Sequence, residues 1–117
     1  MDELFNSGSS FHLHPFTVYH LSKNIDLPAP AQVLISVPKK NFHLAADRNR
    51  IKRLIREAYR QNKHLLYSAL KQNNLQLVLG LIYSAKKIEA SELIQEKITS
   101  VLQRLIRYHV IPEKSSE

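Results

Sequence analysis

Residues 47–60 read DRNRIKRLIREAYR, and the apolar side chains in this stretch recur with the period of an α-helix. Their spacing predicts one helix face buried against a core. The pattern runs to about Leu70, and Asp47 stands where its carboxylate can cap the first backbone amides. The residues of this apolar stripe are Ile51, Leu54, Ile55, Ala58 and Tyr59.

The basic side chains of the same stretch fall on the opposite face of the predicted helix. Guanidinium groups are planar and carry several donors, so arginines gathered on one face can bind the phosphate oxygens of RNA or DNA. Asn49, in the first turn, is equally compatible with bonding to the local backbone and with a direct RNA contact. The cations of this face are Arg48, Arg50, Lys52, Arg53, Arg56, Arg60 and Lys63.

The net charge of the chain comes from one short window. The 117 residues carry 17 Lys plus Arg against 10 Asp plus Glu, a formal charge of +7. Residues 39–63 hold nine of the basic residues and two of the acidic ones, whereas the rest of the chain is balanced. This concentration favours an anion-binding surface. The alternative is a solvated helix face that only keeps the protein soluble.

Strand patterns lie on both sides of this helix. Residues 16–21 and 32–37 alternate as half-buried strands do, and the segment 24–30, with two prolines, connects them. Residues 75–83 are almost continuously apolar, which predicts a strand covered on both faces at the centre of a small sheet.

Two further helices complete the predicted order. One covers about residues 89–108, and a short one near the N-terminus ends at Leu4-Phe5 and is closed by Asn6-Ser7-Gly8. The order helix, strand, strand, helix, strand, helix predicts an α+β fold with helices over a sheet. We expect residues 1–111 to form one domain and residues 112–117 to be a disordered tail.

The chain lacks the residues of several enzyme classes. The absence of cysteine excludes a thiol nucleophile, and the only glycines, Gly8 and Gly80, exclude dinucleotide-binding loops. No paired-carboxylate motif is present, and His12 and His14 have no acidic residue at ligand spacing. We therefore expect no metal site in the protein and no bond-breaking step carried by the polypeptide. His20 is expected in a strand, and His43, His64 and His109 on the surface.

The sequence also predicts where the protein works. Its longest apolar run, Leu77 to Tyr83, is too short to span a membrane, and the acidic start Met1-Asp2-Glu3 is unlike a secretory signal. A chain without cysteine suits a reducing compartment. We expect a cytoplasmic protein with no membrane partner.

Aromatic residues near the N-terminus offer a second way to bind RNA. An antiparallel sheet can expose rings on which unpaired bases stack. Core packing is the favoured interpretation for Phe11 and Phe16, whereas Tyr19 is balanced between core packing and base stacking.

The stretch from Arg48 to Arg60 closely resembles the signature of the bacterial ribonuclease P protein subunit. Ser36-Val37-Pro38-Lys39-Lys40 resembles that family's strand ending in paired basic residues. The similarity extends more loosely from Leu4 to about Leu105, nearly the whole chain. A noncatalytic ribosomal or RNA-chaperone protein remains the alternative, because composition and helix geometry suit it equally well. A helix-turn-helix DNA-binding regulator is disfavoured, because a long apolar strand follows the basic helix.

The resemblance implies a two-layer α-β sandwich with a left-handed β-α-β crossover, against the usual right-handed rule. It also implies that a large catalytic RNA with bound magnesium removes the 5′ leader of precursor tRNA, while a small, monomeric protein assists. The partners would be that RNA subunit and the precursor tRNA, and magnesium would be bound chiefly by the RNA.

The resemblance assigns site residues by position. Phe5 and Tyr19 match the leader-binding cleft, and the RNA-binding positions are Lys39, Lys40, Arg48, Asn49, Arg50, Lys52, Arg53, Arg56 and Arg60. The sequence departs from the family at Ala46, where valine is usual, and before the first helix, where basic residues are missing. Ile82-Tyr83 replaces a basic residue at the end of the last strand, for which Lys86 or Lys87 is a candidate substitute.

Overall fold

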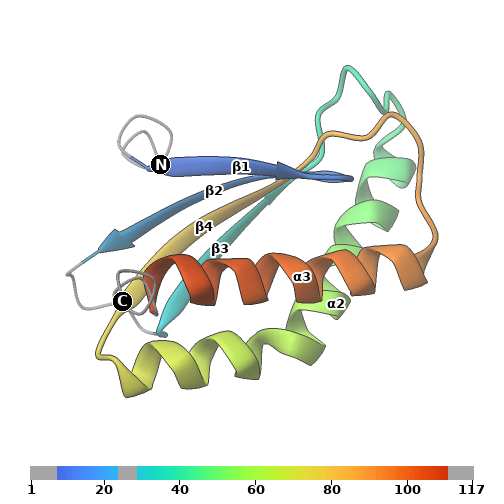
Figure 1. Ribbon diagram of the computed structural model, residues 1–117. Coiled ribbons are helices and arrows are strands. Elements are labelled where there is room, and N and C mark those ends of the chain that lie inside the picture. Colours follow the sequence, from blue (N-terminus) through green and yellow to red (C-terminus); the bar gives the residue numbers. More distant parts are fainter. Residues whose placement is uncertain (1–7, 24–28, 111–117) are drawn as a thin grey trace.

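The computed structural model describes residues 8–23 and 29–110, which form four strands and two helices (Figure 1). The elements predicted between residues 16 and 108 are all present, with ends displaced by a few residues. The short helix predicted before Gly8 and the predicted tail lie outside the described residues. In chain order the elements are β1 (Ser9–Leu13), β2 (Phe16–Lys23), β3 (Ala31–Ser36), α2 (Ala45–Gln72), β4 (Gln76–Tyr83) and α3 (Ser91–His109).

The four strands form one mixed sheet in the order β1-β2-β4-β3. β2 is antiparallel to β1 and to β4, whereas β3 runs parallel to β4 with Ala31 opposite Leu77 and Ser36 opposite Ile82. The prediction that the apolar strand lies inside the sheet is confirmed, because β4 pairs on both edges. α2 connects the parallel pair as a β-α-β crossover, and its left-handedness stays a prediction.

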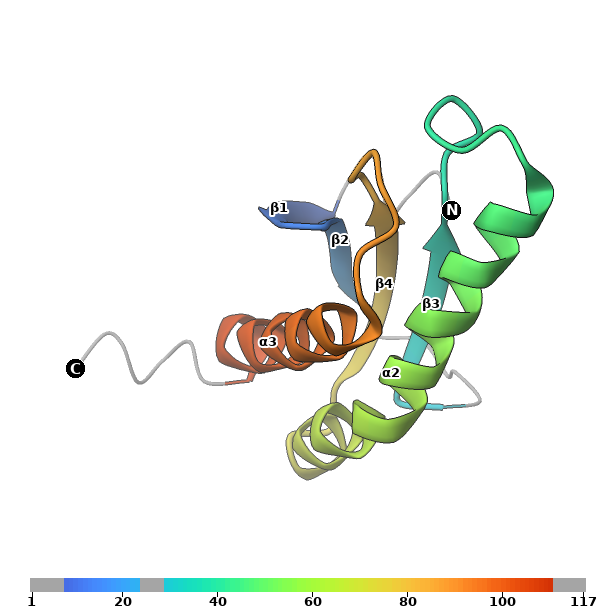
Figure 2. The same cartoon turned by 90° about the vertical axis from the view of Figure 1, so that its right-hand side faces the viewer.

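Both helices pack against one face of the sheet, which gives the expected two-layer α+β arrangement (Figures 1 and 2). Every second side chain of β4 points into the layer between sheet and helices, as the two-residue period of a strand requires. The helices fill the same layer with their apolar stripes. The fully buried side chains of this core include Leu77, Leu79, Leu81 and Tyr83 of β4, Ile51, Ile55 and Leu66 of α2, and Ile94, Ile98 and Leu102 of α3.

The strand β1 was not predicted from the sequence. Its residues pair with β2 from Ser9 opposite His20 to Leu13 opposite Phe16, and a tight connection at His14-Pro15 joins the two strands. Exposed Ser10 and His12 alternate with partly buried Phe11 and Leu13, but this alternation covers only four residues, the shortest run that indicates a strand.

The predicted helix cap at Asp47 is wrong. α2 begins at Ala45, and Leu44 occupies the cap position in an extended conformation without a side-chain cap hydrogen bond. Asp47 lies instead in the first turn, where its negative charge interacts favourably with the positive end of the helix dipole.

Two histidines join the end of α3 to β2, and His109, predicted as a surface residue, is partly exposed there. Nδ1 of His20 lies 2.7 Å from Nε2 of His109, so one ring donates a hydrogen bond and the other accepts it. His20 is only 2% exposed and contacts the rings of Phe11 and Tyr108. Burial, together with the charges of His109 and Arg104, lowers the pKa of His20 to about 4. Burial also lowers the pKa of His109.

This pair makes stability depend on pH. In the unfolded chain a histidine takes up a proton near pH 6.5, whereas folded His20 stays neutral down to about pH 4. Proton uptake between these values therefore favours the unfolded state, and stability falls as the pH is lowered. We expect His20 to account for a loss of up to about 3 kcal/mol over that range.

Urea unfolding at a series of pH values tests this expectation. His20→Leu should flatten the dependence on pH between about 6.5 and 4, whatever its stability at neutral pH. His64→Ala, which removes an exposed histidine of α2, is the control and should keep the dependence of the unsubstituted protein. An unchanged slope in His20→Leu would contradict the assignment.

Candidate nucleic-acid interface

The two faces of α2 have the division of side chains that the sequence predicts. Ile51, Ile55, Ala58 and Tyr59 are buried, and Leu54 is partly buried against the core. Because the basic residues lie on the face of α2 opposite this stripe, packing of the stripe against the core directs them toward solvent. The exposed members are Arg50, Arg53, Arg56 and Arg60, and the partly exposed ones are Arg48, Lys52 and Lys63.

The loop between β3 and α2 folds back onto the start of the helix. Nη1 of Arg48 donates hydrogen bonds to the carbonyl oxygens of Phe42 and His43, both at 2.9 Å. The Phe42 ring is buried and lies 5.9 Å from the ring of Tyr83. These contacts hold the loop that carries the exposed Lys39 and Lys40. Part of the Arg48 guanidinium is therefore used to position the loop, a role that the sequence did not indicate.

Two predicted contact residues have contrasting surroundings. The Arg60 guanidinium donates to both carboxylate oxygens of Glu57, at 3.1 and 2.6 Å, and this hydrogen bonding lowers the pKa of Glu57. Arg60 is thus the only predicted RNA-binding arginine of the described part of α2 that is paired with a carboxylate. The exposed Asn49 side chain makes no hydrogen bond to another described residue, so local backbone bonding does not account for it.

A second pair of lysines lies at the same edge of the sheet. β3 and β4 are parallel, so the chain leaves both strands at that edge, and the exposed Lys86 and Lys87 follow β4 as Lys39 and Lys40 follow β3. The Tyr83 hydroxyl fixes the second loop, because it donates to the Lys87 carbonyl at 2.8 Å and accepts from the Glu89 amide at 2.9 Å.

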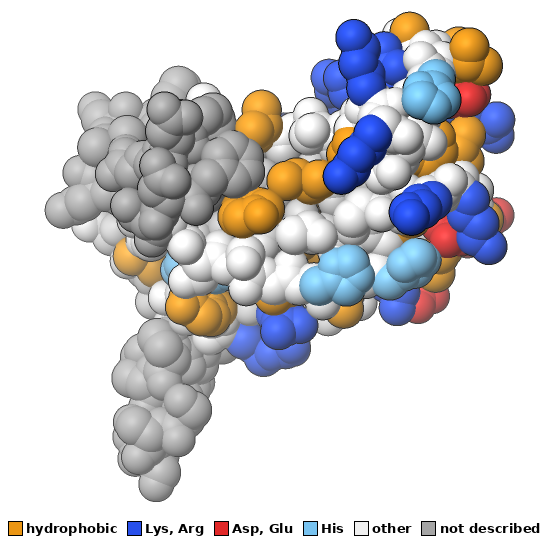
Figure 3. Space-filling model, turned by 90° about the horizontal axis from the view of Figure 1, so that it is seen from above, with side chains coloured by type: hydrophobic (Ala, Val, Ile, Leu, Met, Phe, Trp, Pro, Cys, Tyr) orange, Lys and Arg blue, Asp and Glu red, His pale blue; other side chains and the backbone are white. Residues whose placement is uncertain are grey.

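Lys and Arg side chains gather toward one end of the face seen in Figure 3. This is the end at which the loops after β3 and β4 and the start of α2 lie in Figure 1. We call this surface the basic face; it consists of Arg48, Arg50, Lys52, Arg53, Arg56 and Arg60 of α2 together with Lys39, Lys40, Lys86 and Lys87.

Tyr19 lies on the face of the sheet that the helices leave uncovered. Its neighbours Val18 and His20 are buried on the helix side, so alternation places the partly exposed Tyr19 on the other side. Tyr19 is paired with Ser10 of β1 and with Gly80 of β4. This excludes Tyr19 from the main core. Phe5, the other predicted leader-binding residue, lies outside the described residues.

The remaining aromatic predictions are confirmed. Phe16 is fully buried and packs edge-on against Tyr83, with ring centroids 5.9 Å apart. Phe11 is partly buried and packs against the core. Neither ring is therefore available on the uncovered face of the sheet.

His12 and His14, at the turn between β1 and β2, have different hydrogen-bond partners. Nδ1 of His12 is 3.2 Å from the Thr17 hydroxyl, and Nε2 of His14 is 3.0 Å from a carboxylate oxygen of Glu89. Within residues 8–23 and 29–110, no three His, Asp or Glu side chains are grouped so as to hold a metal ion. Neither helix in these ranges has the length and hydropathy needed to cross a membrane.

Comparison with solved structures relates this geometry to known proteins. The ribonuclease P protein of Thermotoga maritima superposes with a TM-score of 0.69 at 24% identity and covers 86% of each chain, which shows a common fold. The Staphylococcus aureus ribonuclease P protein gives a TM-score of 0.64 at 26% identity, over 89% of this chain and 86% of that one.

Sequence comparison shows that the similarity to ribonuclease P proteins extends from the fold to the amino-acid sequence. A ribonuclease P protein component of Porphyromonas gingivalis is 30% identical over 105 residues, which span 90% of this chain and 77% of the relative. One of Chlorobaculum tepidum is 40% identical over 83 residues, 66% of this chain and 54% of the relative. The family model described as Ribonuclease P matches residues 1–106. The chain therefore belongs to the ribonuclease P protein family.

Proposed function

We propose that this chain is the RNA-binding subunit of a ribonuclease P whose RNA component performs the cleavage. Membership of the family places the chain in tRNA processing as a ribonuclease P protein component. The observation that carries the finer proposal is the basic face, whose cations point outward because the opposite stripe of α2 is buried. A noncatalytic ribosomal or chaperone role is not favoured, because the matched relatives are ribonuclease P proteins.

The basic face binds the catalytic RNA in this proposal. Arg50, Arg53 and Arg56 extend from a helix whose backbone is already ordered, so only their side chains lose conformational freedom when the guanidinium groups bind phosphates. Arg48 contributes mainly by holding the loop of Lys39 and Lys40. Arg60 has to exchange its Glu57 partner for phosphate, so it contributes less than the unpaired arginines. Lys86 and Lys87 take the place of the family's strand-end cation.

The uncovered face of the sheet binds the 5′ leader of precursor tRNA in this proposal. Tyr19 offers a ring on which an unpaired base can stack, and base stacking needs no particular sequence. Lys39 and Lys40, past the end of β3, neutralise leader phosphates. The protein acts as a monomer.

Magnesium belongs to the RNA component in this proposal, where it supplies the charge that activates water for cleavage. The protein's part is to neutralise phosphates and hold the leader.

Reconstitution tests the division of labour. We expect correct 5′ cleavage of a labelled precursor tRNA to be stimulated when the protein is added to a ribonuclease P RNA at limiting magnesium. The protein alone should leave the precursor intact, because no recognisable hydrolytic constellation occurs in its sequence. Cleavage by stringently purified, RNA-free protein would contradict the proposal, as would the lack of stimulation with every suitable RNA.

Replacement of Arg50 and Arg53 by alanine tests the basic face. Both side chains are exposed, so folding should be preserved. Affinity for the catalytic RNA should fall, and the slope of log affinity against log salt should flatten by about one to two units, because fewer counterions are released.

The matched control replaces Lys71 and Arg107, two exposed cations outside the basic face, and removes the same charge. It should leave both quantities nearly unchanged. Equal losses in the two double variants would show general electrostatic attraction instead of a defined surface. Filter binding at several salt concentrations measures both quantities.

Substitution of Tyr19 tests leader binding. Tyr19→Ala should weaken holoenzyme binding of a precursor with a leader of several nucleotides by about tenfold, the equivalent of one stacked base. Binding of mature tRNA, which has no leader, should hardly change, and Tyr19→Phe should retain most of the affinity. Similar losses for precursor and mature tRNA would point instead to a defect in folding or assembly.

A further inference from the structure

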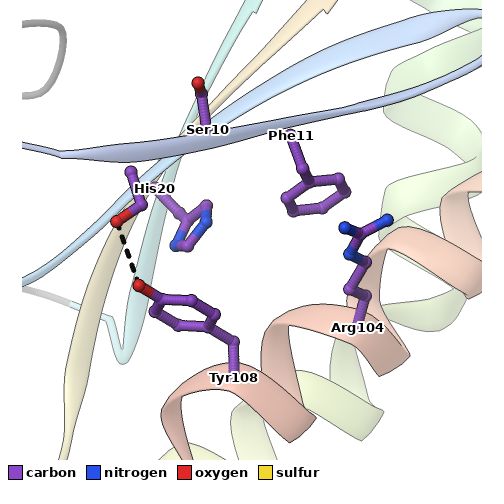
Figure 4. Close-up of a pocket in the computed structure, with 6 residues that line it drawn as sticks. Ser10, Phe11, His20, Arg104 and Tyr108 are labelled. Atoms are coloured by element: carbon purple, nitrogen blue, oxygen red, sulfur yellow. Dashed lines mark hydrogen bonds between the residues drawn. The ribbon is translucent and has the colours of Figure 1, made fainter.

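A cleft that the proposed RNA-binding surfaces do not use lies between β1 and the last turns of α3 (Figure 4). Its volume is about 320 Å³, within the range of small-ligand sites. The start of α2 and the end of α3 lie at opposite ends of the molecule in two perpendicular views, so the cleft is separate from the basic face (Figures 1 and 2). Its lining residues are Ser9, Ser10, Phe11, His20, Arg104 and Tyr108.

Aromatic rings form two sides of this cleft. Phe11 and His20 point from the sheet toward α3, and Tyr108 points back from the helix (Figure 4). Tyr108 is 55% exposed, so much of its side chain can be reached from solvent beside the cleft. Its hydroxyl group shares a hydrogen bond of 3.1 Å with the hydroxyl of Ser9. The ring is therefore held in place before any ligand arrives, which lowers the entropy lost on binding.

The positive charge in the cleft belongs to the planar guanidinium group of Arg104. The Arg104 guanidinium lies 4.3 Å from the centroid of the Phe11 ring. Such stacking uses the flat face of the guanidinium and leaves its N–H groups free to donate at the edge. No carboxylate is among the lining residues, and buried His20, hydrogen-bonded to His109, is neutral at physiological pH. An anionic group is thus attracted to one side of the cleft, beside rings that favour a flat ligand.

We propose that this cleft binds a nucleotide, with its base against Tyr108 and its phosphate on Arg104, whose guanidinium the Phe11 ring holds in place. Inorganic phosphate would leave the aromatic rings without a contact, and an apolar ligand would leave Arg104 and the serine hydroxyls without a polar partner. An unpaired nucleotide of an RNA and a free nucleotide share this chemistry. The inference goes beyond the proposed function, because neither the basic face nor Tyr19 takes part.

Titration of the full-length, ¹⁵N-labelled protein tests the site by NMR. The probes are adenosine 5′-monophosphate, up to about 10 mM, and a single-stranded oligoadenylate of five nucleotides. We expect the backbone amides of Ser10, Phe11 and Tyr108 to shift. Shifts with both probes, or with either one, support the site and identify the source as free nucleotide, RNA or both. No shift at these amides with either probe would overturn the proposal.

Variants separate this site from general attraction to RNA. Arg104→Gln and Tyr108→Ala change exposed side chains, and each should weaken binding seen at these amides at least about fivefold. Tyr108→Phe keeps the ring and should stay within about twofold of the unsubstituted protein. Arg107→Gln, an exposed cation of α3 outside the cleft, is the matched control and should also stay within about twofold.

Binding that survives both Arg104→Gln and Tyr108→Ala would overturn the proposal. The Arg50 and Arg53 double variant should lose affinity for the catalytic RNA and still bind adenosine 5′-monophosphate here. Failure of this site and failure of the basic face are therefore distinguishable.

Discussion

The parallel pairing of β3 with β4 is the constraint on which the basic face depends. Strands that run in the same direction require a crossover connection, and here α2 provides it. The chain leaves both strands at one edge of the sheet, and α2 has to begin at that edge in order to return to the other. The lysine pairs after β3 and β4 and the first arginines of α2 are therefore brought together, although they are far apart in the sequence. An antiparallel pairing would place the two loops at opposite edges.

The single apolar stripe of α2 determines what this arrangement can bind. The stripe packs against the sheet and α3, so only the opposite face of the helix meets solvent, and that face carries most of the net positive charge of the chain. Within it, the cations differ in what they are free to do. Arg48 is held by two loop carbonyls and Arg60 by Glu57, whereas Arg50, Arg53 and Arg56 have no hydrogen-bond partner among the described residues. Arginines on the same helix face therefore differ in how readily their guanidinium groups can bind a phosphate.

Local patterns in the sequence account for most of the fold, and contacts between distant residues account for what was missed. The period of Ile51, Ile55 and Ala58 predicted α2, and the apolar run ending at Tyr83 predicted β4, because burial imposes these patterns. β1 was missed because its alternation of Phe11 and Leu13 with polar residues is very short, and its place in the sheet is evident only from its pairing with β2. The bond between His20 and His109 joins residues 89 positions apart, and no local pattern reports such a pair. The spacing of Glu57 and Arg60, by contrast, is a familiar helical ion-pair spacing and was open to prediction.

Phosphate neutralisation and base stacking place different physical demands on a protein, and the fold separates the residues proposed for each. Phosphate binding gains from many cations on a rigid support and weakens as salt screens them. Stacking needs a ring held at a fixed position and is much less sensitive to salt. The cations occupy one end of the sheet and the start of α2, whereas Tyr19 stands in the middle of a strand and Tyr108 is held at the far end of α3 by Ser9. A cation can therefore be lost from the basic face without moving either ring, because the rings are fixed by strand pairing and by contacts within the other half of the molecule.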